Sequence, residues 1–432
     1  MSTAAGSHLA RILRRVSQGL ERASTTRFVV YAIAASFTAY FCMYAFRKPF
    51  AAASFEGTLW GLDFKIVLVL SQLVGYAISK FVGIRVVSGI SHRRRAQTIL
   101  ILIFLAELAL LAFALLPPGG KVIAIFCNGL PLGAIWGLVF SFLEGRRSSE
   151  ILGASLSTSY IFASGAVKAV GRSMLDANIS ESWMPFLCGL IFAPILLVAV
   201  WALHQIPAPS AEDKKSRCAR TPMSANERRI FFVRHWPGLV MLTGLYMFLT
   251  AYRDFRDNFA VEIFAELGET RSSFLALTEF WVALVVLLGL ATIYAVRDHR
   301  KAFFLVHGLM FVGSATIGLA TVAFELGLLS GLGWMIAIGA GLYLAYVPYG
   351  CVLFDRLIAA TGTVGTAVFM IYVTDALGYT GSISMLLFRT FGDTERSWLE
   401  FFLRFSYLTS AVCCASFFAS AFYFRRTIPR LG

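Results

Sequence analysis

Two short segments of the chain place an arginine inside long apolar runs, and they read almost alike. Phe46–Ala51 reads FRKPFA and Phe255–Ala260 reads FRDNFA, so Arg47 and Arg256 lie 209 positions apart. An arginine at the centre of a membrane-spanning helix costs roughly 2.5–3.5 kcal/mol even on the gentlest scale. Because a guanidinium can hold a phosphate or carboxylate with two parallel hydrogen bonds, the pair predicts a site in which two arginines face one anion across a two-fold axis.

Three more cations lie within apolar runs and are candidate ligands of the same anion. Arg253 precedes Arg256 by one helical turn on the same face, so either can be the partner of Arg47. The internal repeat favours Arg256. Lys80 and Lys168 are expected to support the anion. For Lys80, as for Arg47 and Arg256, the alternative is a long side chain that reaches the membrane surface.

Two acids inside apolar runs suggest a different chemistry. Asp375 and Glu279 are candidate proton-coupling residues, because a carboxylate within a membrane is protonated, paired or facing water. If these two acids couple proton movement to transport, the arginines form structural ion pairs and the transported solute is neutral or cationic. Glu107 also lies in an apolar run, and we expect a structural pairing there.

Aromatic side chains accompany these charges. Tyr44, Trp136 and Tyr346 lie in the same or matching runs, where hydroxyl and indole groups can bind a hydroxylated solute. The seven cysteines show no metal-ligand spacing, and no nucleotide-binding loop or nucleophile motif is present. We therefore expect no metal, no cofactor and no enzymatic activity.

The composition of the chain indicates which kind of secondary-structure element positions these residues. The chain has 432 residues, of which 58% are hydrophobic and 14% charged, and its mean hydropathy is +0.73. Soluble domains carry about 25% charged residues, whereas a membrane-spanning helix needs about 20 consecutive apolar residues. Such runs predict twelve spans, at 28–50, 62–84, 97–116, 121–143, 151–173, 184–204, 237–260, 272–296, 302–324, 331–354, 362–387 and 399–424. The fifth and eleventh runs are rich in small and hydroxylated residues, which predicts helices packed inside a bundle.

The distribution of basic residues among the loops explains the net charge of +14. Most of the Lys and Arg residues lie in segments on the side of the N-terminus, and acids such as Glu181 and Glu266 lie in the opposite loops. By the positive-inside rule both termini are cytoplasmic, in a multi-pass integral membrane protein. Nucleic-acid binding is not needed to explain the charge.

The longest polar interval, 205–235, divides the runs six and six. We therefore expect a cytoplasmic N-terminal segment (1–26), a six-helix bundle (27–204), a cytoplasmic linker (205–235), a second bundle (236–424) and a cytoplasmic tail (425–432). The N-terminal segment has an apolar stripe and scattered arginines. It is typical of a helix on an anionic membrane surface, although an organellar transit peptide has similar features.

A 6+6 plan with a long basic linker resembles the major facilitator superfamily, whose halves are parallel repeats. The Gly129–Gly133 segment (GLPLG) and the Gly341–Ala345 segment (GLYLA) match at an offset of 212, close to that of the arginine segments. The resemblance implies an all-α fold of twelve transmembrane helices with pseudo-two-fold symmetry. It also implies that the first, fourth, seventh and tenth spans line a central cavity.

Three blocks of the N-terminal half resemble organophosphate:phosphate antiporters. They are Tyr40–Phe50 (YFCMYAFRKPF), Gly75–Phe81 (GYAISKF), and Asn128-Gly129 with Gly133 and Trp136. The chain departs from that family in two places. The 89–95 loop lacks the usual Asp before its basic cluster. Ser159–Val170 holds no histidine, and Lys168 is the only charged side chain there.

These observations predict a secondary active transporter of a small organic anion. A phosphorylated metabolite is the first candidate, and the resemblance implies exchange against phosphate. We expect a monomer in the bacterial inner membrane. The alternatives are a proton-coupled carrier of a neutral or cationic solute, which would use Asp375 and Glu279, and a facilitator-like receptor that does not transport.

Overall fold

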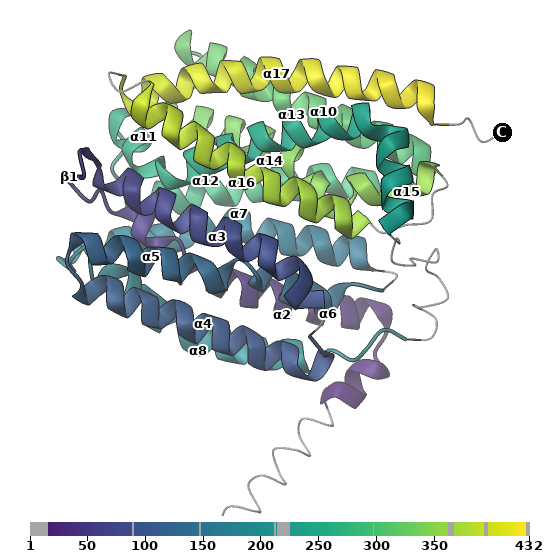
Figure 1. Ribbon diagram of the computed structural model, residues 1–432, viewed down its shortest axis with the longest axis horizontal. Coiled ribbons are helices and arrows are strands. Elements are labelled where there is room, and N and C mark those ends of the chain that lie inside the picture. The colour runs from purple at the N-terminus through teal and green to yellow at the C-terminus, as the bar shows by residue number, and fades with distance from the viewer. Residues whose placement is uncertain are drawn as a thin grey trace, which may run out of the picture.

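The computed structural model describes residues 16–88, 90–146, 148–210, 213, 225–296, 298–361, 367–392 and 396–428. Within these ranges the chain is almost entirely helical, and the strands seen there are a short hairpin of β1 (Thr58–Leu59) and antiparallel β2 (Leu62–Asp63). The long helices run side by side along one direction (Figure 1). The prediction of an all-helical fold is confirmed.

The N-terminal helices follow the first six predicted spans. Ser24 caps the first of them by accepting a hydrogen bond from the backbone N–H of Arg27. The fourth predicted span is interrupted at Gly133 and Ala134 and forms two helices. The elements are α2 (Thr25–Tyr44), the 3₁₀ helix η1 (Pro49–Ala52), α3 (Phe64–Ser88), α4 (His92–Leu115), α5 (Pro118–Leu132), α6 (Ile135–Leu143), α7 (Ser149–Asp176) and α8 (Met184–His204).

The C-terminal helices follow the other six predicted spans, again with breaks. The chain leaves the helix briefly at Phe259 and at Val352, so that a short helix follows each of two long ones. The elements are α10 (Ala225–Asn258), α11 (Ala260–Glu266), α12 (Ser272–Tyr294), α13 (His299–Glu325), α14 (Gly331–Cys351), α15 (Leu353–Thr361), α16 (Ala367–Phe391) and α17 (Trp398–Thr427).

Nine segments of the described chain are long and apolar enough to cross a membrane. The three remaining predicted spans lie on α7, α10 and α16, which are long enough but too polar for that criterion. The charged and hydroxylated residues singled out above account for this polarity. The structure therefore supports a multi-pass membrane protein, and the count of twelve spans stays a prediction.

Two of the polar helices lie where the N-terminal and C-terminal helices meet: α7 packs along α12, and α16 packs along α3. At Gly165 of α7, an added Cβ would lie 2.2 Å from the carbonyl oxygen of Leu275 on α12, so only glycine permits this approach. Residues 152–159 of α7 are buried, as expected for a span packed inside the bundle.

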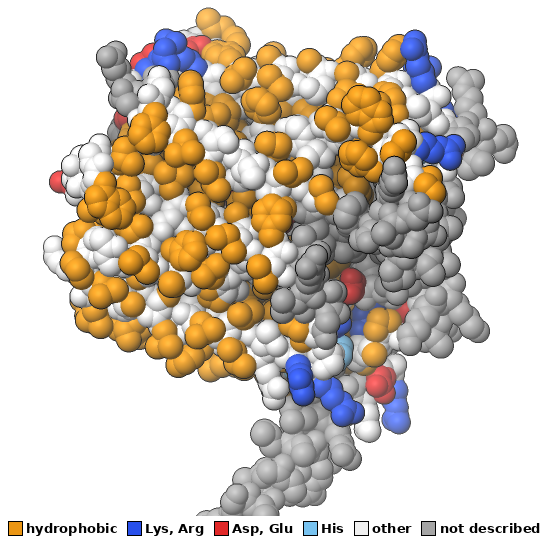
Figure 2. Space-filling view, in the orientation of Figure 1, with side chains coloured by type: hydrophobic (Ala, Val, Ile, Leu, Met, Phe, Trp, Pro, Cys, Tyr) orange, Lys and Arg blue, Asp and Glu red, His pale blue; other side chains and the backbone are white. Residues whose placement is uncertain are grey.

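Apolar side chains cover the face of the molecule shown in Figure 2. Large apolar side chains are exposed on several helices of the described chain, for example Phe104, Val198, Leu319 and Phe418. An apolar surface of this extent suits contact with lipid. The start of α2 and the end of α17 lie at one end of the bundle, and η1, β1 and α11 lie at the other (Figure 1). Residues 1–15, residues 211–212 and 214–224 of the linker, and residues 429–432 are outside the described residues, so the predictions for these segments stay predictions.

Candidate functional site

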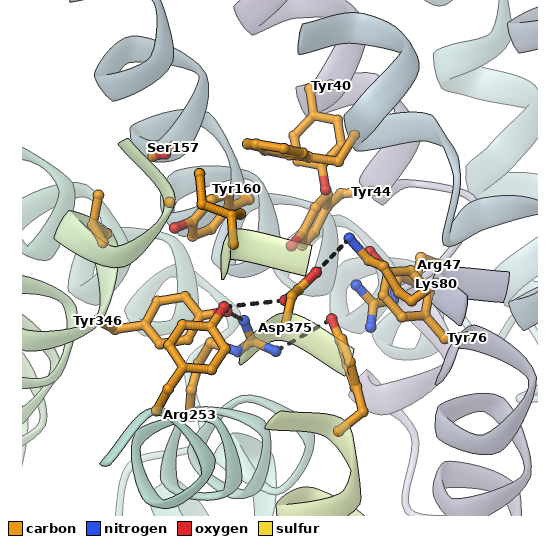
Figure 3. Close-up of a pocket in the computed structure, with 16 residues that line it drawn as sticks. Tyr40, Tyr44, Arg47, Tyr76, Lys80, Ser157, Tyr160, Arg253, Tyr346 and Asp375 are labelled. Carbon is orange, nitrogen blue, oxygen red and sulfur yellow. Dashed lines mark hydrogen bonds and ion pairs between the residues drawn. The ribbon is translucent and has the colours of Figure 1, made fainter. Parts of the chain in front are cut away.

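A small cavity lies between the N-terminal and C-terminal helices near the middle of the bundle (Figure 3). Its volume is about 60 Å³, room for about four or five water molecules at roughly 10–15 Å³ each. Both sets of helices contribute to its lining, which consists of Tyr40, Tyr44, Arg47, Tyr76, Lys80, Trp136, Ser157, Tyr160, Tyr246, Arg253, Tyr346, Val347, Gly350, Ile371, Asp375 and Tyr379. This is the expected place for a solute in a transporter that alternates between two open states.

Arg47 reaches the cavity because the chain leaves the helix just before it. α2 ends at Tyr44, and the backbone N–H groups of Phe46 and Arg47 then bond three residues back, in tight turns that lead to Pro49. The freed side chain lies against the ring of Tyr76, with its Cζ 3.8 Å from the ring centroid.

The Arg47 guanidinium is buried without a counter-ion. Arg47 is 4% exposed, and its Nε has no hydrogen-bond partner among the described residues. Throughout the described ranges no carboxylate lies within 4 Å of it. A buried cation is stable only when paired or hydrogen-bonded, and the Tyr76 ring supplies only part of that stabilisation. Arg47 is thus a cation that an anion in the cavity would complete.

Arg253 lines the other side of the cavity and is already paired. Its Nη2 lies 2.7 Å from Oδ1 of Asp254, and the other oxygen of Asp254 accepts a hydrogen bond from Ser382 at 2.7 Å. Arg253 also donates to the hydroxyl of Tyr346 and lies over that ring. Its charge is therefore balanced within the C-terminal helices.

Lys80 and Asp375 join the two sides of the cavity. Nζ of Lys80 on α3 lies 2.8 Å from Oδ2 of Asp375 on α16. Oδ1 of Asp375 accepts a hydrogen bond from Tyr246 at 3.0 Å, and the hydroxyls of Tyr246 and Tyr346 are 2.7 Å apart. Figure 3 shows Asp375 between Lys80 on one side and the Tyr346–Arg253 contact on the other. A continuous polar chain therefore crosses from the N-terminal to the C-terminal helices.

The structure places Arg256 away from the cavity, which reverses the preference drawn from the repeat. Arg256 is 2% exposed and its Nη1 lies 2.6 Å from Oε1 of Glu279, while its Nη2 donates to the carbonyl of Met335 at 3.0 Å. α10 stays helical through Asn258, so this side chain leaves a regular helix toward α12 and α14. The first segment has already left its helix at the equivalent point, so the two arginines point differently.

Glu279 is likewise outside the cavity, as the partner of Arg256. Lys168 is outside it too, because it binds Asp257 at 2.8 Å and the backbone carbonyl of the same residue at 2.7 Å. The structure brings together the other candidates at the cavity, namely Arg47, Arg253, Lys80, Asp375, Tyr44, Trp136 and Tyr346. Whether each of these binds a solute stays a prediction.

A second cluster of charges closes the end of the bundle that carries η1 and α11. Asp257 on α10 binds Lys48 at 2.5 Å and Lys168 at 2.8 Å, and it also accepts from Ser164. Lys65, at the start of α3, pairs with Glu262 on α11. In each pair the cation comes from the N-terminal helices and the anion from the C-terminal helices.

Sequence reasoning missed Lys48 and Lys65 as functional candidates. Lys48 stands directly beside Arg47 in the repeated motif, and Asp257 stands beside Arg256. This juxtaposition of opposite charges at equivalent positions was the available signal. Lys65 carried no such signal, because a lysine at the start of an apolar run is typical of a membrane surface.

The solved structures that this chain resembles are transporters. It matches a D-xylose-proton symporter with a TM-score of 0.63, 12% identity and coverage of 94% of this chain and 98% of the other. It matches the nucleoside transporter NupG (D323A mutant) with a TM-score of 0.54, 14% identity and coverage of 91% and 99%. For the human organic anion transporter MFSD10 (TETRAN) the TM-score is 0.55, with 12% identity and coverage of 92% and 100%. At such identities the matches show the fold alone, which this chain shares with these three structures.

None of the curated protein sequences matches the chain. The resemblance to organophosphate:phosphate antiporters therefore stays a prediction. One family model matches residues 49–427, which run from just after Arg47 to the end of α17. The chain accordingly belongs to the family described as "Family of unknown function (DUF5690)".

Proposed function

We propose that this protein is a secondary transporter that carries a small organic anion by alternating access, and that the anionic group binds at Arg47. The observation that carries the proposal is the buried Arg47 guanidinium, which faces the cavity with no carboxylate within 4 Å across the described residues. The other cavity charges are balanced, Arg253 by Asp254 and Lys80 by Asp375. One positive charge is left for the solute.

This charge balance bears on the kind of anion. A carboxylate or a singly charged phosphate diester matches one free arginine. A phosphate monoester carries a charge of about −1.5 to −2 near neutral pH, so it needs a second cation. Arg253 can supply that cation if the ester displaces Asp254. A phosphorylated metabolite remains the first candidate because of the resemblance of the N-terminal half to organophosphate:phosphate antiporters, with competition for Arg253 as part of its binding.

The competition between the solute and Asp254 for Arg253 also links binding of the solute to movement of the two sets of helices. Arg47 belongs to the N-terminal helices and Arg253 to the C-terminal helices, so an anion that contacts both draws the two sets together. Five tyrosines beside them can bind hydroxyl groups of the solute, and they are Tyr40, Tyr44, Tyr160, Tyr346 and Tyr379.

A binding measurement on purified protein tests the proposal. Phosphate, phosphorylated sugars and carboxylates are screened by thermal shift against the parent protein and Arg47→Gln. A hydrogen-bonded charge contributes about 1.5–3 kcal/mol, so Arg47→Gln should weaken the best ligand roughly 10- to 100-fold. The control is Arg172→Gln, which removes an arginine that is paired with Asp176 and partly exposed. Equal affinity in Arg47→Gln and the parent protein would exclude the anion site. Uptake into proteoliposomes then separates a transporter from a receptor.

A second candidate function rests on the Lys80–Asp375 pair. It is the charged contact between the two sets of helices that lies inside the cavity, and a proton on Asp375 would break it. A proton-coupled carrier of a neutral or cationic solute would use such a switch. Uptake that requires a pH gradient and is lost in Asp375→Asn, but persists in Arg47→Gln, would favour this function.

A further inference from the structure

A groove on the outer surface lies between the start of α13 and the end of α17. Its volume is about 640 Å³, and its lining consists of Arg300, Lys301, Phe304, Phe418, Ala421, Phe422 and Arg425. The groove is separate from the central cavity, because none of these residues lines that cavity. It lies at the end of the bundle where α2 begins and α17 ends (Figure 1).

The polar part of the groove is a cluster of cations without acidic partners. Arg300 and Lys301 come from the first turn of α13, and Arg425 comes from the last turn of α17. No carboxylate lies within 4 Å of any of these three charged groups in the part of the chain that the structure describes. Nε of Arg300 is buried and has no hydrogen-bond partner there. Two helices thus hold three positive charges around a space that no carboxylate of the described ranges fills.

The remaining part of the groove is aromatic. Phe418 and Phe422 are 69% and 51% exposed on α17, and Phe304 faces them from α13. Cζ of Arg300 lies 5.8 Å from the centroid of the Phe304 ring. Directly beside the groove, Cζ of Arg426 lies 4.1 Å from the centroid of Phe422. Arg300 and Arg426 therefore lie against aromatic rings, so that the cations of this region adjoin an apolar surface.

We propose that this groove binds an anionic phospholipid, with the phosphate between Arg300, Lys301 and Arg425 and an acyl chain along Phe304, Phe418 and Phe422. A soluble anion could use the cations but would leave the phenyl rings exposed. A zwitterionic lipid could cover the rings but would bring its own cation to the cluster. Only an amphiphile with net negative charge complements both parts.

The position of the groove agrees with this occupant. The positive-inside rule places this end of the bundle on the cytoplasmic side, where anionic lipids attract basic residues next to membrane-spanning helices. The proposal is independent of the proposed solute, because the groove and the central cavity share no lining residue.

The test is native mass spectrometry of the full-length protein with phosphatidylglycerol and phosphatidylcholine of identical acyl chains. The parent protein is compared with Arg300→Gln/Arg425→Gln. The matched control is Arg93→Gln/Arg94→Gln, which removes two exposed arginines at the start of α4 on the same end of the bundle. We expect the parent and the control to prefer phosphatidylglycerol, and the groove variant to lose that preference by on the order of tenfold.

Two further measurements keep the proposal open to refutation even if the groove variant folds poorly. Arg300→Lys/Arg425→Lys keeps the charges and should keep the preference. A photoreactive phosphatidylglycerol on the unmodified protein should attach near residues 300–304 and 418–425. Attachment elsewhere, an equal loss in the control variant, or complete displacement of the lipid by glycerol phosphate would overturn the proposal.

Discussion

Lys48 and Asp257 form an ion pair of 2.5 Å between the N-terminal and the C-terminal helices. They occupy the same place in the two copies of the repeated motif, directly after Arg47 and Arg256. Positions related by a two-fold axis can touch only close to that axis. The repeat therefore does mark a contact across the two halves of the sequence, but the contact is between a cation and an anion of the protein rather than between two arginines and a solute.

The first prediction concerns Asp257, which binds both Lys48 and Lys168. Asp257→Asn leaves two lysines that are 2% and 1% exposed without a counter-ion. Breaking a buried pair from one side costs about 3–5 kcal/mol, so we expect a loss of that order in the free energy of unfolding. It is measured by denaturant titration in mixed micelles.

The matched control for Asp257→Asn is Asp176→Asn. Asp176 pairs with Arg172 at 3.3 Å, but both side chains are substantially exposed. Exposed pairs contribute about 0–1 kcal/mol, so this variant should lose little. Equal losses in the two variants would show that the charge cluster at the η1 and α11 end does not hold the two sets of helices together.

The second prediction is a coupling between Lys80 and Asp375. Lys80→Gln and Asp375→Asn each leave one buried charge, whereas the double variant leaves none. Contacting charged residues show interaction energies of about 0.5–3 kcal/mol, so the double variant should be more stable than the sum of the single losses predicts. Thermal unfolding of the parent protein, the two single variants and the double variant in one detergent gives this interaction energy. Strictly additive losses of stability would contradict the pairing.

Much of the fold follows from hydrophobic runs of about twenty residues, because a span must bury its backbone hydrogen bonds whatever its neighbours are. Tyr44, Trp136, Lys80 and Asp375 also line the cavity as their positions in the runs indicated. Lys80 and Asp375 lie well within α3 and α16, where the direction of a side chain follows from helical phase.

The pairing of charges could not be predicted in the same way. The repeat indicated that Arg47 and Arg256 are equivalent, but α2 ends at Tyr44 whereas α10 continues to Asn258. A local break of the helix redirects every side chain after it. Arg253 therefore takes the place at the cavity that the repeat assigned to Arg256, and no pattern of residue types reports such a break reliably.

The third prediction follows from the Arg253–Asp254 pair at the cavity. Asp254→Asn leaves Arg253 free to bind a second negative charge, while Arg47 is unchanged. Affinity for phosphate monoesters should rise relative to singly charged phosphate diesters, by about tenfold if one charge-assisted hydrogen bond is gained. Isothermal titration with a monoester and its methyl diester measures the ratio. An unchanged ratio would mean that Arg253 takes no part in binding the anion.

The fourth prediction separates a structural arginine from a binding arginine. Arg256 and Glu279 form a 2.6 Å pair that is buried among α10, α12 and α14. Arg256→Met alone leaves the carboxylate of Glu279 unpaired and should cost about 3–5 kcal/mol of stability, whereas replacement of a whole buried pair by apolar residues is often neutral or stabilising. Arg256→Met/Glu279→Leu should therefore recover most of the loss, as thermal unfolding shows.

The same double variant decides which seventh-span arginine serves the solute. Because neither residue lines the cavity, Arg256→Met/Glu279→Leu should bind the best anionic ligand with the affinity of the parent protein. Arg253→Gln should weaken that ligand, since its guanidinium lies at the cavity wall. If the double variant folds normally and still loses the anion, Arg256 acts at the site by a route other than the arrangement seen here, and the assignment of Arg253 in its place is wrong.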